Sequence, residues 1–177
     1  MAALPDLITV AQYRQITEDG NAYELHHGEV VRVKRPKARH YKLQLVLERL
    51  LAKKLMSFGE VAIEMPYRPV AEFELCAADV AALSHKRWDE IDPNDNLRGA
   101  PELVIEVKSP SNTDTQLREL ASLCLANGCL QLWIVDADRK LVTVIQRDGS
   151  TEAFGENDEI PLGAFGGDHV RLADIFA

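Results

Sequence analysis

The stretch ELVIEVKS, residues 102–109, decides the fold that this sequence predicts. It is rich in β-branched residues and is followed by SPSNTD, which breaks the strand and supplies candidate helix caps. Successive residues of a strand point to opposite faces, so Glu106 and Lys108 share one face while Ile105 and Val107 share the other. The stretch therefore predicts a strand whose polar face opens to solvent at its end.

The elements on either side of this strand predict an α/β fold with a mixed sheet. Alternating or continuous apolar runs between turns predict further strands at 22–34 (a hairpin turning at Gly28), 61–70, 72–84, 130–136 and 141–147. Apolar stripes at helical spacing predict helices at 40–56 and 115–126. Residues 85–100 are polar and predict a long loop or a short helix within a loop, and the last thirty residues predict a short strand with irregular packing. We expect one domain over residues 1–177, with helices on the faces of the sheet.

The composition places the chain among ordinary globular proteins. Hydrophobic residues make up 46% of the 177 and charged residues 27%, which excludes wholesale disorder. Three cysteines without a C-x-x-C pair argue against a disulfide scaffold or a zinc ribbon. No apolar run approaches the ~20 residues that a membrane helix needs. We expect a cytoplasmic protein with no membrane partner.

The charge is distributed unevenly along the chain. The net charge is −8, which by itself disfavours a nucleic-acid partner. Residues 28–54 nevertheless hold nine basic and two acidic residues, a net +7, so the remainder carries −15. Such asymmetry can mark a phosphate-binding face, or it can be the solvated side of a loop and a helix.

Two further acids change the interpretation of Glu106 and Lys108. Alone, that pair is better explained by an ion pair on a wet sheet face than by a catalytic site, because the pattern is short and common. Asp79 lies in the small and apolar segment CAADVAALS, where an unpaired charge is costly. If that segment neighbours residues 102–109, Asp79, Glu106 and Lys108 form an Asp…Glu-x-Lys set. Glu24, inside an apolar hairpin, is a further candidate.

At this point the chain resembles a known family. Asp79 with Glu106-Val-Lys108 resembles the PD-(D/E)XK nuclease signature. From about Ile8 onward the chain is similar to the Uma-type "putative restriction endonuclease" family. The matching blocks, in order, are ITVAQYRQI, YELHHGEVV, His40 at a helix start, the Asp79 strand, Arg87-Trp88, PELVIEVKSPSNT and NGCLQLWIVDADRKLVTV.

The resemblance implies a restriction-endonuclease-like fold and a divalent-metal site. Asp79 and Glu106 would bind Mg²⁺ or Mn²⁺, with Glu24 as an additional ligand. Lys108 would position the attacking water and stabilise developing charge. The expected reaction is phosphodiester hydrolysis, with DNA as the expected partner. Contacts to its phosphates are expected from the basic segment, at Lys34, Arg35, Lys37, Arg39 and His40.

The chain departs from the family pattern at three positions. Ala78 stands where the signature usually has proline. Leu120 and Cys124 stand where members often carry a lysine and, four residues later, an aromatic residue. These departures leave a second hypothesis open, a catalytically decayed binding or regulatory module on the same fold, which could be homodimeric. A metal-dependent hydrolase of small phosphates is a third.

The histidines admit two interpretations each. His26 shares a face with Glu24, so the two could bind a transition metal, but exposed turn histidines are the favoured interpretation of His26-His27. His40, at a helix start, is either a surface histidine or a group that approaches the site from the side of the basic loop.

Overall fold

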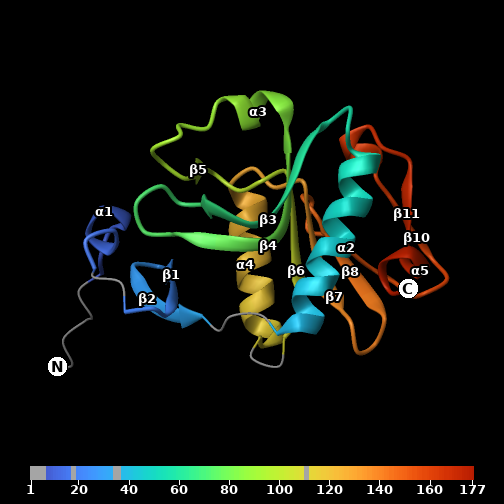
Figure 1. The fold of residues 1–177 in the computed structure, drawn as a ribbon, viewed down its shortest axis with the longest axis horizontal. Coiled ribbons are helices and arrows are strands. Elements are labelled where there is room, and N and C mark those ends of the chain that lie inside the picture. The colour runs from blue at the N-terminus through green and yellow to red at the C-terminus, as the bar shows by residue number, and fades with distance from the viewer. Residues whose placement is uncertain (1–6, 17–18, 34–36, 110–111) are drawn as a thin grey trace.

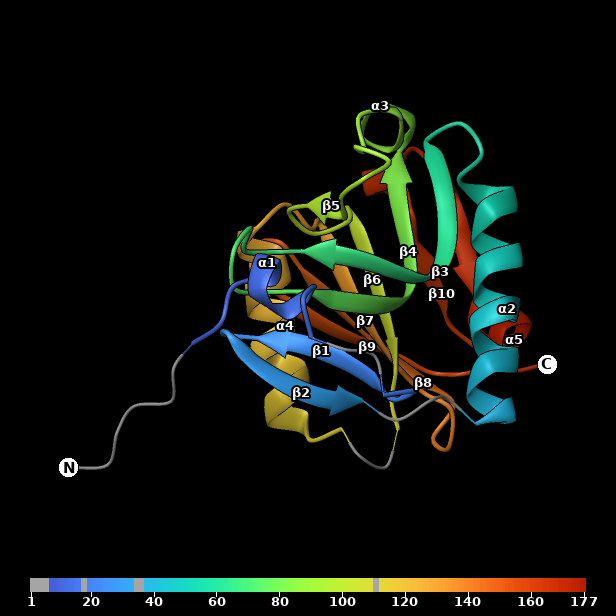
Figure 2. The ribbon, with the colours of Figure 1, turned by 60° about the vertical axis from the view of Figure 1, so that its left-hand side comes forward.

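A seven-stranded mixed sheet forms the centre of the molecule (Figures 1 and 2). The computed structural model describes residues 7–16, 19–33, 37–109 and 112–177. The strand order is β5-β3-β4-β6-β7-β8-β9. In chain order these strands are β3 (Gly59–Arg68), β4 (Cys76–Ser84), β5 (Leu97–Arg98), β6 (Leu103–Val107), β7 (Gln131–Asp136), β8 (Leu141–Gln146) and β9 (Thr151–Phe154). The predicted α/β class and mixed sheet are confirmed.

Strand β6 lies at the middle of the sheet, as its apolar sequence predicts. It pairs antiparallel with β4 and parallel with β7. Four of its five residues are buried, and Glu106 is the exception. A strand covered on both faces needs a nearly continuous apolar run, and residues 103–105 supply it.

Two helices cover the two faces of the sheet. Helix α2 (Ala38–Lys54) lies on one face and α4 (Asp114–Ala126) on the other, as Figure 2 shows. The α2-side core contains the leucine stripe of α2, at Leu43, Leu47, Leu51 and, just past the helix, Leu55. The α4-side core contains Ala121 and Cys124. Both helices begin and end within two residues of the predicted bounds.

Helix α4 begins at a capping box that the sequence SPSNTD supplies. The Thr113 hydroxyl accepts from the backbone N–H of Gln116, and the Gln116 side chain accepts from the backbone N–H of Thr113. The two side chains satisfy backbone donors that the first turn leaves unpaired. This fixes the start of α4 directly after the end of β6.

The hairpin β3–β4 bends sharply in the middle (Figure 2). Glu64 has φ of 50°, and the register passes over Glu64 and Asp79, between the pairs Ile63↔Val80 and Met65↔Ala78. On one side of the bend Ile63 and Val80 pack in the α2-side core, and on the other Met65 and Ala78 pack in the α4-side core. The bend therefore lies at Glu64 and Asp79.

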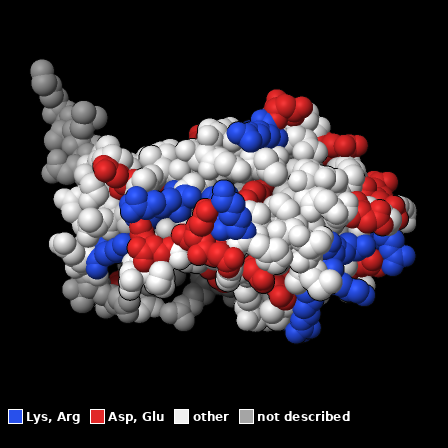
Figure 3. Space-filling view, turned by 90° about the horizontal axis from the view of Figure 1, so that it is seen from above, with Lys and Arg blue, Asp and Glu red and all other residues white. Residues whose placement is uncertain are grey.

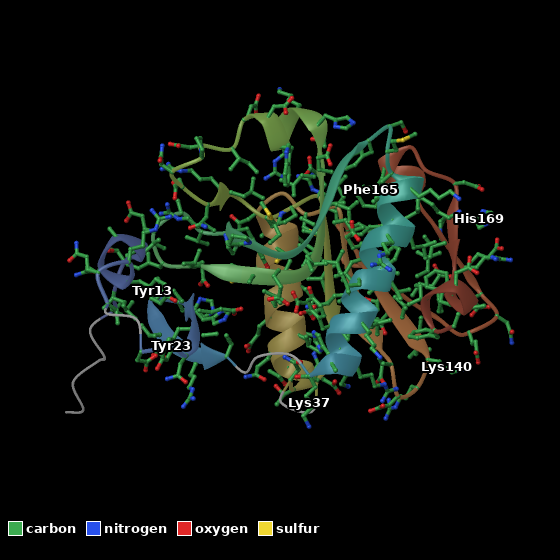
Figure 4. All side chains as sticks on the ribbon, in the orientation of Figure 1. Tyr13, Tyr23, Lys37, Lys140, Phe165 and His169 are labelled. Carbon is green, nitrogen blue, oxygen red and sulfur yellow. The ribbon has the colours of Figure 1, made fainter. Side chains whose placement is uncertain are left out.

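A second hairpin, β1 (Ala22–His26) and β2 (Glu29–Val33), packs beside the start of β4. It turns at His27 and Gly28, as predicted. Leu25 and Leu75 exchange two backbone hydrogen bonds, of 3.0 and 2.8 Å, which join it to the chain entering β4. A short helix, α1 (Val10–Tyr13), lies next to it, and the Tyr13 hydroxyl donates to the carbonyl of Tyr23 (Figure 4).

The remaining segments contain more regular structure than the sequence predicts. The polar segment 85–100 contains α3 (His85–Asp89), which is the short helix in a loop, and also the two-residue strand β5, which was not predicted. After β9 come β10 (Glu159–Pro161), a 3₁₀ helix (Gly163–Phe165), β11 (His169–Arg171) and α5 (Leu172–Ile175). Their apolar residues close the α2-side core, a long-range role that local patterns do not reveal. Within the described residues, no helix is both long and apolar enough to span a membrane.

Gly59, at the start of β3, gives a test of this packing. A Cβ there would lie 1.7 Å from the backbone carbonyl oxygen of Leu83 on β4, whereas Gly163 has open space around it. We expect Gly59→Ala to lower the free energy of unfolding by about 1–3 kcal/mol or more, since the backbone of β4 must shift. Gly163→Ala is the matched control and should be close to neutral. Urea unfolding measures both, and equal effects would contradict the described approach of β3 and β4.

Candidate active site

Asp79 and Glu106 meet where β4 and β6 separate. The last assigned pair of the two strands is Val80↔Ile105, and continuing that register places Asp79 opposite Glu106. There the Asp79 carboxylate accepts a 2.7 Å hydrogen bond from the backbone N–H of Val107. The backbone of Asp79 in turn lowers the pKa of the Glu106 carboxyl, against the larger effect of burial. The Asp79 carboxylate thus replaces a ladder hydrogen bond directly beside Glu106.

Glu106 lies in a strongly negative environment. Burial raises the pKa of its carboxyl well above the usual value, and the negative charges of Asp79, Glu24 and Glu64 raise it further. Within the described residues, no lysine or arginine forms an ion pair with Asp79, Glu106 or Glu64. Among the described residues only the imidazoles of His40 and His26 pair with these four acids, at Asp79 and Glu24. The remaining negative charge is costly, and a bound divalent cation would reduce that cost.

Helix α2 contributes two polar side chains to the same point. His40 and Gln44 are four residues apart and so share one face of the helix. The Nε2 of His40 lies 2.9 Å from Oδ1 of Asp79. The hydrogen bond to Asp79 raises the pKa of the His40 imidazole, and the charges of Asp79 and Glu64 add to this against the opposing effect of burial. Of the two interpretations of His40, the structure shows the one at the site.

Gln44 is fully buried, and no sequence pattern marks it as a site residue. Its Nε2 donates to Oδ1 of Asp79 at 2.7 Å and to Oε1 of Glu64 at 2.5 Å. Its Oε1 is buried and has no partner among the described residues. Two carboxylate acceptors fix the amide orientation and leave this oxygen available, and an amide oxygen is a ligand that hard cations accept. The residues present therefore fit a divalent cation.

Glu64 is the second residue that the sequence analysis missed. It lies in VAIEMPYRPV, and the argument that singled out Asp79, an acid in an apolar strand, applies to it equally. The signal was present. What the sequence does not show is that Glu64 and Asp79 lie opposite each other at the bend.

Lys108 lies beyond the end of β6 and contacts other acids. Its Nζ is 2.8 Å from Oδ1 of Asp114, at the start of α4, and 4.0 Å from Oδ2 of Asp136, at the end of β7. The hydrogen bond from Lys108 lowers the pKa of Asp114. The Lys108 side chain is 29% exposed, so a substrate could reach it. In the structure, its recorded ion pairs are with these two acids and not with Asp79 or Glu106.

Glu24 approaches the cluster from the β1–β2 hairpin. Its carboxylate is 2.7 Å from Nε2 of His26, and its charge contributes to the raised pKa of Glu106. The backbone bridge between Leu25 and Leu75 brings it there. Among the described residues, the ion-pair partner of Glu24 is therefore His26.

The basic segment is only partly described. Lys34 and Arg35 lie outside the described residues. Lys37 is the residue before α2 and lies at the end of the molecule opposite α3 (Figure 4). Arg39 pairs with Asp138 at 2.6 Å and donates to the carbonyl of Ala137 at 3.0 Å, so its charge is partly offset.

The face around α3 is not a uniformly basic surface. Figure 3 shows lysines and arginines mixed with acids there. Asp95 accounts for part of this mixing, because it pairs with Arg14, Arg68 and Arg98.

Comparison with known proteins identifies the family and the fold of the chain. The model of the Uma2 family, described as "Putative restriction endonuclease", matches residues 10–172. The chain belongs to the Uma2 family. The Uma2 match includes Glu24, His40, Gln44, Asp79, Glu106 and Lys108. No curated protein matches the chain.

A solved structure shares the fold of this Uma2 chain. It is the crystal structure of a "putative nuclease belonging to DUF820" from Anabaena variabilis. The TM-score is 0.80 at 20% sequence identity, over 96% of this chain and 97% of that one. At that identity the likeness establishes the fold, and it confirms the predicted nuclease-like architecture.

The positions that depart from the family pattern are packed in the α4-side core. Ala78 and Cys124 are buried, and Leu120 packs against them as a partly buried residue. The Sγ of Cys124 is 3.2 Å from the hydroxyl of the buried Tyr67. Burial raises the pKa of the Cys124 thiol beyond the range in which it would ionise. Helix α4 thus contributes apolar packing at these positions instead of a charge.

The His40–Asp79 contact predicts a pH dependence of stability. Because the contact raises the pKa of folded His40, its stabilisation is complete below the unfolded imidazole pKa of about 6.5 and is lost as pH rises through the folded value. We expect His40→Gln, which keeps a neutral donor, to reduce the free energy of unfolding more near about pH 6 than near about pH 9. Urea unfolding in the presence of a chelator measures this. His85→Gln, on α3, is the control, and a loss for His40→Gln that is equal at both pH values would contradict the assignment.

Proposed function

We propose that this chain is a divalent-metal-dependent endonuclease that hydrolyses phosphodiester bonds in DNA. The observation that carries the proposal is the adjacent pair of Asp79 and Glu106, opposite each other where β4 and β6 separate and at a point with excess negative charge. The Uma2 match supports a nuclease. The metal and the DNA substrate go beyond that match and are what we propose.

Asp79 and Glu106 would hold Mg²⁺ or Mn²⁺, and Glu24 and the free Oε1 of Gln44 would complete the ligands directly or through water. When bound, the cation would polarise the phosphoryl oxygen and acidify a water. Gln44 and the backbone N–H of Val107 hold the Asp79 carboxylate in one orientation. The raised pKa of His40 favours the protonated imidazole beside Asp79.

Lys108 would act on the phosphate that enters between α4 and the ends of β6 and β7. Its ammonium is already placed by Asp114 and Asp136, and a phosphate oxygen would compete with Asp114, whose side chain is 68% exposed. An ammonium released from Asp114 can position the water and stabilise developing charge.

A second candidate, a nuclease fold that binds without cleaving, is favoured by one observation. Lys108 contacts Asp114 and Asp136, and Leu120 supplies no replacement charge on α4. This module would keep the fold and could act as a homodimer. The experiments below separate it from the enzyme.

The site variants test metal binding and cleavage separately. We expect Mn²⁺ to raise the melting temperature of the wild type and of Lys108→Ala, because a ligand of the folded state stabilises it. Asp79→Asn and Glu106→Gln should lose that shift. Plasmid cleavage with Mn²⁺ should fall about 10²–10⁴-fold in Lys108→Ala.

Lys140→Ala is the matched control, since Lys140 also pairs with a single acid at the surface, Glu156. It should cleave like the wild type. Full activity in Lys108→Ala would remove that lysine from the mechanism. Metal binding without cleavage in the wild type would favour the non-cleaving module.

The basic segment predicts a salt-dependent interaction with duplex DNA. Each phosphate that a cation neutralises contributes about −0.9 to the slope of log affinity against log salt. We expect replacement of Lys34, Arg35, Lys37 and Arg39 by alanine to weaken binding and flatten the slope. Lys53→Ala with Lys54→Ala, at the far end of α2, should change little. Binding is measured across a salt series with Ca²⁺ in place of Mn²⁺, and no binding at low salt would exclude DNA as the partner.

A further inference from the structure

A second group of metal-binding side chains lies at the junction of the β1–β2 hairpin with β4. It comprises Glu24, His26 and Cys76, and one ligand atom of each lies within 4.8 Å of the others. His26 ends β1 and Cys76 begins β4. The two backbone hydrogen bonds between Leu25 and Leu75 lock the neighbouring residues together, so the group is positioned by the main chain.

The two ring nitrogens of His26 have different partners. Nε2 is 2.7 Å from the Glu24 carboxylate, whereas Nδ1 is 3.8 Å from Sγ of Cys76. With Nε2–H donating to Glu24, Nδ1 presents a lone pair toward the thiol. Metal-binding histidines are commonly oriented by a carboxylate on the other nitrogen in this way. A tetrahedral zinc site separates its nitrogen and sulfur ligands by about 3.5 Å, close to the observed spacing.

Glu74 supplies an independent observation at the same point. Its side chain is 2% exposed, and its Oε1 accepts from the backbone N–H of His27 at 2.8 Å. Its Oε2 is buried without a hydrogen-bond partner among the described residues and lies 3.8 Å from Nδ1 of His26. A buried carboxylate oxygen left in this state is costly, and a cation on the Nδ1 side of His26 would satisfy it.

We propose that His26, Cys76 and Glu74, with His26 oriented by Glu24, form a binding site for a zinc-like transition-metal ion. A thiolate and an imidazole favour Zn²⁺ or Co²⁺ over Mg²⁺, which prefers oxygen ligands. Binding releases the proton of the Cys76 thiol to solvent, since the thiolate is the ligand. The ion enters past His26, whose side chain is 33% exposed.

This site shares Glu24 with the proposed nuclease centre, but its other residues are different and it does not rest on that function. A proton on His26 would offset one of the two negative charges of Glu24 and Glu74, and Cys76 would then serve only in the packing of the α4-side core. The metal and the proton therefore make different predictions for Cys76, and the test below uses them. Since Glu24 also acts on Glu106, a cation held here would reduce the negative charge felt by the other site.

Co²⁺ titration of the purified full chain is the test, because a thiolate ligand gives a sulfur-to-cobalt charge-transfer band in the near ultraviolet. We expect the wild type to show the band and Zn²⁺ to abolish it by displacement. Cys76→Ser should lose the band. Glu24→Gln should weaken Co²⁺ binding by about 10–100-fold, as the loss of an orienting carboxylate does.

Three controls make the outcome decisive. Cys129→Ser removes another buried thiol, one that donates to the Gln131 carbonyl, and should keep the band. Asp79→Asn should keep it too, which separates this site from the nuclease centre. If Cys76→Ser fails to fold, His26→Gln replaces it, with an expected loss of at least about tenfold in affinity. No band in the wild type, or a band that persists in Cys76→Ser, would overturn the proposal.

Discussion

The site depends on the hydrogen bond that the backbone N–H of Val107 donates to the Asp79 carboxylate. Strands β4 and β6 pair as far as Val80 and Ile105 and then separate, which would leave backbone donors unpaired inside the sheet. The Asp79 carboxylate accepts one of these donors, the backbone N–H of Val107. The orientation of Asp79 is therefore held by a contact that also completes the sheet beside Glu106.

The cost of this arrangement is concentrated negative charge. Glu64 and Glu24 add to the pair, and the described cationic partners are the histidines, His40 at Asp79 and His26 at Glu24. Imidazoles compensate only when protonated, so the balance of the cluster depends on pH and on any bound cation. Two chemically different cation sites can therefore lie side by side, one with oxygen ligands around Asp79 and one with a thiol and an imidazole around Cys76.

Much of the fold followed from local patterns. The leucine stripe of α2, the capping box of α4 and the β-branched run of β6 are short-range signals, and each predicted its element to within a few residues. The segment after Asp148 was predicted poorly because its short strands are stabilised by distant contacts of residues such as Ile160 and Phe165 with the α2-side core. For the site, Asp79, Glu106 and Glu24 could be selected as acids in largely apolar segments, and His40 only through the family resemblance. Gln44 could not be selected, because a glutamine on a helix carries no such signal.

The sequence by itself determined which residues were candidates, because an acid in an apolar strand is costly wherever that strand packs, and it determined the α/β class through periodicity. Only the tertiary structure decided which candidates meet. The bend at Glu64 places that residue opposite Asp79, and the backbone bridge at Leu75 brings Glu24 and His26 to Cys76, 50 positions away in the chain. It also decided that Lys108 pairs with Asp114 and Asp136. The physical reason is that side-chain contacts across strands are set by register and by strand curvature, which arise from packing of the whole sheet and leave no local pattern in the chain.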